Sequence, residues 1–301
     1  MLMNFAQVRQ AARDAAGFVM AVAKAEDDAS VEAAVHAQRE GLAEAILVGR
    51  SEEIRSKVVH FGGNPSDFEI RDMDDEQACA DEVVRLAAEG RAHVLLKGRL
   101  PTSVLLRSVF AKQGGLRTGR IVSDVRLFDH PFKEDGFLAV TDGGVIPAPN
   151  LEQKRAIVEN AVWVYHRLGI DSPKVAALCA VEKVQPGMIH TEEAARLKQW
   201  NQDGTIAGCV LEGPISLDLA LVRKAVEIKG YESPVAGRAD ILLGPTIEAV
   251  NILGKSLVYF KGCVPGQVVV GAKVPVLIPS RADPAEVKLN SVALAAVVAL
   301  R

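Results

Sequence analysis

The sequence is poor in aromatic residues and in cysteine. Phe, Trp and Tyr together make up 5% of its 301 residues, whereas hydrophobic residues reach 49%, so Val, Leu, Ile and Ala must build the core. The four cysteines, Cys79, Cys179, Cys209 and Cys263, form no C-x-x-C pair, which argues against a zinc site and a disulfide framework. We therefore expect free thiols, no bound metal and a reducing, cytoplasmic location.

A strong charge imbalance and a long apolar run are also missing. The formal net charge is -3, from 35 Lys and Arg against 38 Asp and Glu. This balance excludes a nucleic-acid protein held by bulk positive charge, but not a local site for a phosphorylated ligand. The most apolar stretch, residues 292–300, is far shorter than the ~20 residues that span a bilayer, and residues 1–16 lack the apolar core of a signal peptide. We expect neither a nucleic-acid nor a membrane partner.

Several catalytic and nucleotide-binding motifs are absent as well. No G-x-G-x-x-G follows an apolar run, and neither H-E-x-x-H nor G-x-S-x-G occurs, so a Rossmann fingerprint, a zinc protease and a serine hydrolase have no support. Residues 266–273 superficially resemble a P-loop. An extra Ala272 precedes the lysine, and Val274 stands where Ser or Thr is required, so we set this motif aside.

What the chain does contain is an alternation of short aliphatic runs and helical patterns, which is typical of an α/β fold with a parallel sheet covered on both faces. A Gly- and Pro-rich segment at 142–149 indicates a boundary, and we expect the C-terminal segment to return to the first domain. The predicted domains are 1–143 with 271–301, and 144–270. Strands are predicted at 18–23, 45–48, 93–97, 136–141, 174–181, 209–211, 239–243, 268–270 and 275–278, and helices at 28–40, 51–60, 76–90, 102–112, 151–168, 191–203, 217–229, 247–261 and 284–300.

The last third of the chain concentrates the candidate chemistry. Ser280 and Arg281 follow an apolar run and precede a helix that begins near Pro284, at the carboxyl end of a strand where open α/β sheets bind ligands. Arg281 can hold a phosphate bidentately, and the helix N-terminus adds free N–H groups. Ser280 can donate to a carbonyl oxygen as charge develops on it. Asn251 and Lys255 are four residues apart and share one helix face.

The chain resembles the phosphate acetyl/butyryltransferase family, in particular its phosphotransbutyrylase branch. The resemblance implies transfer of an acyl group between coenzyme A and phosphate. It also implies two α/β/α domains around a cleft, as in the isocitrate/isopropylmalate dehydrogenase-like fold, and at least a dimer. The matching segments run collinearly along most of the chain: AILVG from residue 45, LLKG from 95, GLRTGRIVSDV from 115, TDGG from 141, KRAIVENAV from 154, ADILLGPTIEAVNILGKSLVYF from 239, VGAKVPVLIPSRAD from 270 and AEVKLNSVALA from 285.

The resemblance also assigns roles to single residues. Ser280 and Arg281 match the family's Ser-Arg pair, in which the arginine is implicated in binding phosphate or acyl phosphate and the serine in transition-state stabilisation. The substrate-binding candidates are Lys97, Thr102, Asn251, Lys255, Lys273 and Asp283. The expected substrates are acyl-CoA, CoA, phosphate and acyl phosphate, with no tightly bound cofactor.

Three positions depart from the family pattern. Val250 and Gly254 replace a Gly and a Tyr of the motif around Asn251, and the lost ring predicts a reshaped acyl pocket. The acetyl-specific branch has an aspartate seven positions after the serine, where this chain has Val287. The base for the coenzyme A thiol is then unassigned: Glu286 is adjacent and is the candidate, and Asp283 lies closer to the Ser-Arg pair, but neither matches the family residue.

Three alternatives stay open. A metal- and nicotinamide-dependent decarboxylating dehydrogenase shares the expected fold, and Asp72, Asp74 and Asp75 form an acidic cluster. A non-catalytic coenzyme A-binding paralogue is compatible with the altered motif. Cys263, which follows Lys261-Gly262, would be the nucleophile of a covalent acyl-enzyme route.

Overall fold

The structure is a computed structural model that describes residues 1–301 except Gln113, Arg281 and Arg301. The chain divides into two compact units. The first unit comprises residues 5–120 and 266–301, and the second comprises residues 1–4 and 121–265.

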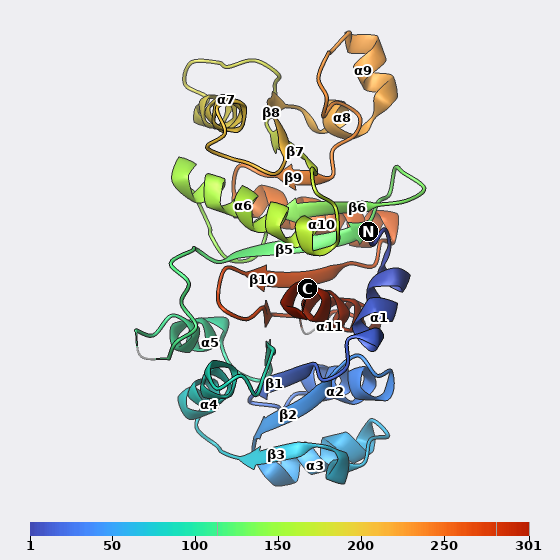
Figure 1. Cartoon of the computed structure of the whole chain (residues 1–301), viewed down its shortest axis with the longest axis vertical. Coiled ribbons are helices and arrows are strands. Elements are labelled where there is room, and N and C mark those ends of the chain that lie inside the picture. The colour runs from blue at the N-terminus through green and yellow to red at the C-terminus, as the bar shows by residue number, and fades with distance from the viewer. Residues whose placement is uncertain (113, 281, 301) are drawn as a thin grey trace. The chain divides into compact units, whose positions relative to one another are not determined.

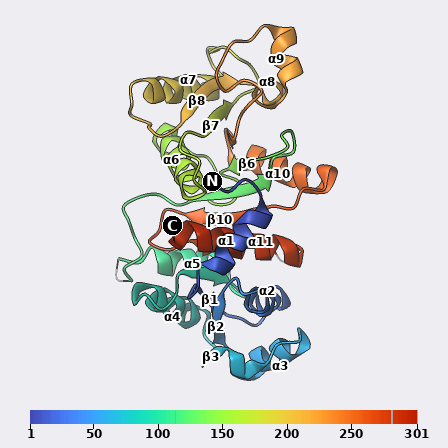
Figure 2. The same cartoon turned by 45° about the vertical axis from the view of Figure 1, so that its right-hand side comes forward.

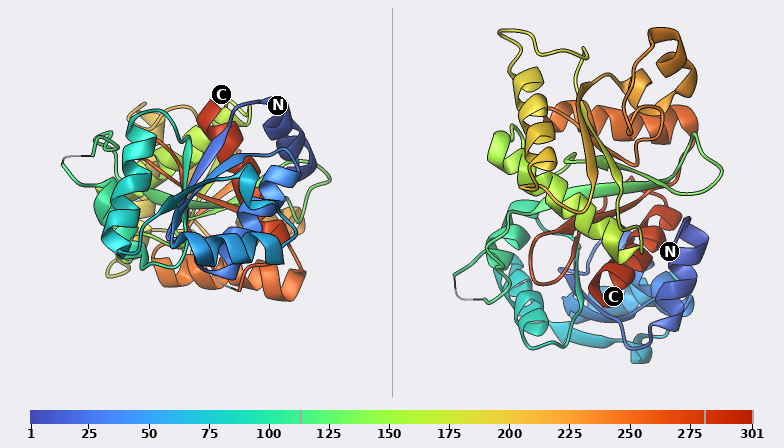
Figure 3. Two further views of the ribbon diagram at one scale, coloured as in Figure 1. Left: turned by 90° about the horizontal axis from the view of Figure 1, so that it is seen from below. Right: turned by 45° about the horizontal axis from the view of Figure 1, so that its top comes forward.

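The first unit contains a six-stranded sheet in the order β3-β2-β1-β4-β11-β10. All its neighbouring strands are parallel except β10 and β11, which pair antiparallel. The helices α4 and α5 lie on one face, and α1, α2, α3 and α11 on the other (Figure 1, and Figure 3, left). Its elements are α1 (Phe5–Asp14), β1 (Val19–Ala23), α2 (Asp28–Arg39), β2 (Glu44–Gly49), α3 (Ser51–His60), η1 (Pro65–Asp67), β3 (Glu69–Asp72), α4 (Glu76–Ala88), β4 (Val94–Lys97), α5 (Thr102–Val109), β10 (Gly266–Val270), β11 (Val276–Leu277) and α11 (Ala285–Leu300).

The second unit contains a five-stranded sheet in the order β5-β6-β9-β7-β8. The hairpin β5–β6 is antiparallel and the remaining pairs are parallel. The helices α6 and α7 lie on one face, with α8 and α10 on the other (Figure 2). Its elements are β5 (Ser123–Asp129), β6 (Phe137–Thr141), α6 (Leu151–Arg167), β7 (Lys174–Leu178), α7 (Ile189–Gln202), β8 (Val210–Ile215), α8 (Leu217–Leu221), α9 (Arg223–Lys229), β9 (Ile241–Leu243) and α10 (Ile247–Lys261).

Local sequence explains most of these elements. The strand β1 is buried along VMAVA, as strands covered on both faces should be. Asp27 and Asp75 cap α2 and α4 by accepting the N–H groups of Ser30 and Ala78. The helix α11 is buried from Val287 to Val298, as expected for a helix that is apolar nearly all round.

Some expectations differ from the structure. In the helix predicted at 51–60, Arg50 occupies the N-cap position and Ser51 is the first helical residue. The single helix expected at 217–229 is two helices, because Val222 has an extended backbone conformation. The antiparallel pairs β5–β6 and β10–β11 interrupt the expected parallel pattern, and α1, β3 and β5 had not been expected.

The boundary between the units also differs from the predicted one. Sequence placed residues 121–143 in the first domain, at the Gly- and Pro-rich break. The strands β5 and β6 pair with each other, and β6 pairs with β9. Residues 121–143 therefore belong to the second unit, and the chain returns to the first unit at Gly266. Within the described residues, no helix combines the length and apolarity needed to cross a bilayer.

Candidate functional site

The carboxyl ends of β1, β4 and β11 lie side by side at one edge of the first unit's sheet. In the register of the ladder, Lys97 pairs with Ala23, and Leu277 pairs with Leu96. From β1 the chain adds β2 and β3 on one side of the sheet and then places β4 on the other side of β1. Such a topological switch point is where open α/β sheets bind ligands. Lys24, Gly98 and Ser280 follow these three strands.

Lys24 anchors this edge through a buried ion pair. Its Nζ lies 2.7 Å from Glu26 Oε1 and 3.0 Å from Asp74 Oδ1, and its backbone is left-handed, with φ 56°. Burial lowers the pKa of Lys24, but hydrogen bonds to the two carboxylates outweigh burial and raise it. Burial raises the pKa of Glu26, but Lys24 and Arg50 outweigh it and leave that pKa below its usual value. Both members of the pair are therefore charged at neutral pH.

The segment from Lys97 to Thr102 packs against this anchor. The N–H groups of Gly98 and Arg99 donate to the carbonyls of Ala23 and Lys24, at 2.9 and 2.8 Å. A Cβ atom on Gly98 would lie 2.3 Å from the Lys24 oxygen, so only glycine allows this approach. Lys97 Nζ donates to the carbonyls of Gly98 and Leu100, and Thr102 begins α5.

Ser280 lies in a short turn between β11 and α11, which we call the Ser280 turn and define by Ser280, Ala282 and Asp283. The Ser280 N–H donates to Asp283 Oδ2 at 2.8 Å, and the Asp283 N–H donates to the Ser280 carbonyl at 3.1 Å. The Ala282 N–H donates to Ser280 Oγ at 3.4 Å. The bonds hold the backbone of the turn, and Ser280 is exposed just before α11. Arg281 lies outside the described residues.

The other candidates of the first unit are placed differently. Glu286 is exposed in the first turn of α11, and its carboxylate lies 3.8 Å from the Arg9 guanidinium of α1. Val287, at the position of the acetyl branch's aspartate, is buried. Lys273 lies between β10 and β11, before β11 begins, and its N–H donates to the Leu116 carbonyl. Lys273 is thus at the amino end of β11, whereas Ser280 is at the carboxyl end.

The second unit builds a rigid loop at the carboxyl end of β6. Asp142 is buried and accepts the N–H groups of Asp124, Gly144, Val145 and Ile146 at 2.9–3.2 Å. Burial raises the pKa of Asp142, against the opposing effect of these hydrogen bonds.

The helix α10 closes on this loop. Asn251 Nδ2 donates to the Gly143 carbonyl at 3.0 Å, while Lys255, one turn later, is exposed. Val250 fills the space beside two glycines. A Cβ atom added to Gly143 would lie 3.1 Å from the Val250 side chain, and one added to Gly244 would lie 2.1 Å from it. The valine at this motif position is a packing residue.

Gly254 faces the sheet of its own unit. It is buried, and a Cβ atom there would lie 3.1 Å from the Arg126 Nη1 atom and 3.4 Å from its Cδ. Any side chain at this position would begin in contact with Arg126. The glycine therefore allows α10 to pack closely against Arg126 of β5.

The acidic cluster and the cysteines have ordinary structural partners. Asp72 accepts the Ser51 N–H, Asp74 pairs with Lys24, and Asp75 caps α4. Across the described residues, no group of three or more His, Cys, Asp or Glu side chains is placed to hold a metal ion.

The four cysteine thiols are free. Burial raises the pKa of Cys79, Cys179 and Cys209 to about 11 and raises that of Cys263, which disfavours a thiolate nucleophile at neutral pH.

Comparison with known proteins identifies the class. Residues 73–296 match the family described as phosphate acetyl/butaryl transferase. The phosphate butyryltransferase of Clostridium acetobutylicum is 43% identical over 280 residues, which cover 93% of both chains. The phosphate acetyltransferase of Thermotoga maritima is 39% identical over 94% of this chain and 96% of that one. The crystal structure of a branched-chain phosphotransacylase from Enterococcus faecalis V583 is similar with a TM-score of 0.83 at 30% identity, over 95% of this chain and 100% of that one.

These similarities and the α/β fold define an acyltransferase. The chain belongs to the phosphate acetyl/butaryl transferase family, which confirms the resemblance drawn from its motifs and disfavours the dehydrogenase alternative.

Sequence reasoning missed two anchors of the site. Lys24 and Glu26 follow the apolar run of β1 directly, and Asp142 follows that of β6. Charged residues immediately after a buried strand lie where α/β sheets bind ligands, and this signal was available in the sequence. Their partners Asp74 and Arg50 are distant along the chain and were not predictable.

Proposed function

We propose that this enzyme catalyses reversible transfer of a short-chain acyl group, butyryl or similar, between coenzyme A and inorganic phosphate. Acyl-CoA and phosphate give acyl phosphate and CoA. Coenzyme A acts as a substrate, without a tightly bound cofactor. The proposal includes two α/β/α domains around a cleft, a homodimer or higher oligomer, and a cytoplasmic location.

The observation that carries the proposal is the Ser280 turn at the carboxyl edge of the first unit, in a chain of this family. Backbone hydrogen bonds hold the turn that carries the Ser280 hydroxyl, and a hydroxyl on a preformed turn can donate to an oxyanion, which is the usual basis of electrostatic transition-state stabilisation. Arg281, the next residue, supplies a guanidinium group that can bind phosphate through two parallel hydrogen bonds.

The reaction then proceeds by direct transfer in a ternary complex. The thiol of CoA loses its proton, and the thiolate attacks the carbonyl carbon of the acyl phosphate. A C–S bond forms and the C–O bond to phosphate breaks. Ser280 donates to the oxyanion, and Arg281 holds the departing phosphate.

The proton acceptor and the binding residues complete the proposal. Glu286 takes the thiol proton, with Asp283 as the neighbouring carboxylate. Lys97, Thr102, Lys273 and Asp283 of the first unit, and Asn251 and Lys255 of the second, bind the substrates. A comparison of Glu286→Gln with Asp283→Asn assigns the base, because only the base variant removes the acidic limb of the pH–rate profile for CoA acylation.

The decisive experiment offers butyryl-CoA and phosphate to the purified chain and measures both thiol release and acyl phosphate trapped by hydroxylamine. We expect equimolar thiol and acyl phosphate. Thiol release without acyl phosphate would indicate hydrolysis, and no reaction with any acyl-CoA would support the non-catalytic paralogue. Nicotinamide reduction with hydroxy acids would support the dehydrogenase.

A further inference from the structure

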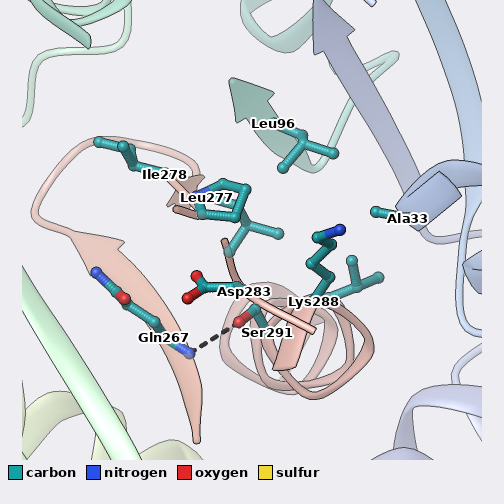
Figure 4. A pocket seen from close by; sticks show the side chains of 10 residues that line it. Ala33, Leu96, Gln267, Leu277, Ile278, Asp283, Lys288 and Ser291 are labelled. Atoms are coloured by element: carbon teal, nitrogen blue, oxygen red, sulfur yellow. Dashed lines mark hydrogen bonds between the residues drawn. The ribbon is translucent and has the colours of Figure 1, made fainter. Parts of the chain in front are cut away.

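A small cavity opens beside the Ser280 turn, inside the first unit (Figure 4). It lies between the sheet face of β4 and β11 and the helices α2 and α11. Its inner walls are apolar and buried, from Ala33, Leu96, Leu277 and Val292, each no more than 2% exposed. Half-buried Ile278 and Pro279 form the rim that leads to Ser280.

The polar groups on the cavity wall are bonded to one another or to neighbouring groups. Lys288 Nζ pairs with Glu32 Oε2 at 2.9 Å. Ser291 Oγ accepts the Gln267 N–H at 2.9 Å (Figure 4) and donates to the Val287 carbonyl at 2.7 Å. Asp283 accepts the Ser280 N–H. These groups already have partners, so an apolar ligand that enters the cavity does not need to break their hydrogen bonds.

We propose that this cavity receives the end of the acyl chain, so that Ala33 and Val292 set the chain-length preference; this inference rests on the proposed acyl transfer at Ser280. When the acyl carbonyl accepts from Ser280, its hydrocarbon chain extends along Ile278 and Pro279, which directly precede the serine. The inner walls then contact the terminal carbons.

The size of the cavity makes the expectation specific. Its free volume is about 10 Å³, close to the space of a single water-sized group. We expect an acetyl methyl to stay at the rim and the last carbon of a butyryl chain to reach the inner walls. A side chain that fills this space should oppose butyryl while sparing acetyl, and one that enlarges it should favour longer chains.

The test compares kcat/KM for acetyl-, butyryl- and pentanoyl-CoA with phosphate in two opposite variants. Ala33→Val fills the cavity and is expected to lower the butyryl-to-acetyl ratio at least about tenfold, the usual lower bound for one misfitted methylene. Val292→Ala enlarges the cavity and is expected to raise the pentanoyl-to-butyryl ratio several-fold.

Each variant has a control on its own helix. Ala37→Val on α2 and Val298→Ala on α11 change buried residues that do not line the cavity, and both should keep the wild-type ratios. Ratios within a protein are insensitive to the fraction folded, and thermal unfolding reports that fraction.

If the wild-type protein is active but both cavity variants keep its ratios, or the controls change the ratios equally, the inference about the cavity is overturned and the proposed function is not. Wild-type protein that forms no acyl phosphate from any acyl-CoA would overturn the proposed function as well.

Discussion

The two sheets stabilise charge at their carboxyl edges in different ways. In the first unit, the buried Glu26 carboxylate is matched by the cations of Lys24 and Arg50. In the second unit, the buried Asp142 carboxylate is matched by four backbone N–H groups. The directions of the two pKa shifts are accordingly opposite.

We infer that the carboxyl edge of the first unit carries the reacting groups and that the carboxyl edge of the second unit holds loop structure. The ion pair of the first unit supports the segment that contains Lys97, and the Ser280 turn beside it presents an exposed hydroxyl. The amide-bound Asp142 instead fixes a glycine loop, on which Asn251 and Val250 close. We therefore expect substitution of Ser280 at the first edge to affect the reaction, and substitutions of Asp142 and Asn251 at the second to affect stability first.

The largest expected effect contrasts Ser280→Ala with Asn251→Ala. Removing a donor to the oxyanion typically lowers kcat by about 10²- to 10³-fold, and the exposed Ser280 side chain has no core packing to lose. Asn251→Ala removes the bond to Gly143 and should destabilise by about 1 kcal/mol with a smaller loss of kcat. Steady-state kinetics and thermal unfolding of both variants check the contrast, with Ser66→Ala, an exposed serine on η1, as control. Equal losses of kcat would erase the distinction between the edges.

The next effect compares two buried lysines. Lys24→Met leaves Glu26 with Arg50 alone, and we expect a loss of about 3 kcal/mol, the low end for breaking a buried pair. Lys154→Met in the second unit should cost less, because its partner Glu193 is 15% exposed. Urea unfolding measures both values, and Lys24→Arg should restore part of the first. A larger loss for Lys154→Met would reverse the ranking.

Two glycines sharpen the comparison further. Gly98→Ala forces a Cβ atom against a backbone oxygen, and we expect a cost of about 3 kcal/mol, at the upper end for overpacking. At Gly244→Ala the atom closest to the new Cβ atom is a Val250 side-chain methyl, so the loss in the double variant with Val250→Gly should be smaller than the sum of the two single losses. Thermal unfolding of the single and double variants decides this. Losses that simply add would show that the loop itself excludes the methyl group.

The smallest expected effect is a pH dependence of opposite sign at the two edges. Glu26 has a lowered pKa, so its contribution to stability is present above its unfolded pKa and is lost as the pH falls through the folded pKa. Asp142 has a raised pKa, so stability falls as the pH rises through its folded value. Unfolding between about pH 3 and 6 should show a weaker acid loss in Glu26→Gln and a steeper one in Asp142→Asn. Parallel shifts in the two variants would contradict the opposite pKa directions.

The sequence predicted the parts of the fold that depend on local pattern. The buried runs of β1 and β4 and the helices α2 and α10 lie close to their expected positions, because apolar periodicity and caps determine them. The position of Ser280 at the carboxyl end of a strand followed from the apolar run and helix start around it. The roles of the site residues themselves came from the family resemblance.

Features that depend on distant partners were not predictable. The short strand β11 pairs parallel with β4 and antiparallel with β10. Nothing local in Val276–Leu277 encodes that difference. The neighbour of Gly254 is Arg126, far away in sequence, and the reshaped acyl pocket expected at Gly254 stays a prediction. The register that brings Lys24 to Asp74 likewise arises only when the sheet forms.

The most direct test is acyl phosphate formation by Arg281→Ala, measured by ³¹P NMR with butyryl-CoA and phosphate and compared with wild type and Arg281→Lys. We expect turnover to fall by orders of magnitude in the alanine variant with an unchanged thermal transition. The lysine variant should recover only part of the activity, because an ammonium lacks the planar donor pair of arginine. Near-normal acyl phosphate formation by Arg281→Ala would contradict the assignment of the reaction to the carboxyl edge of the first unit.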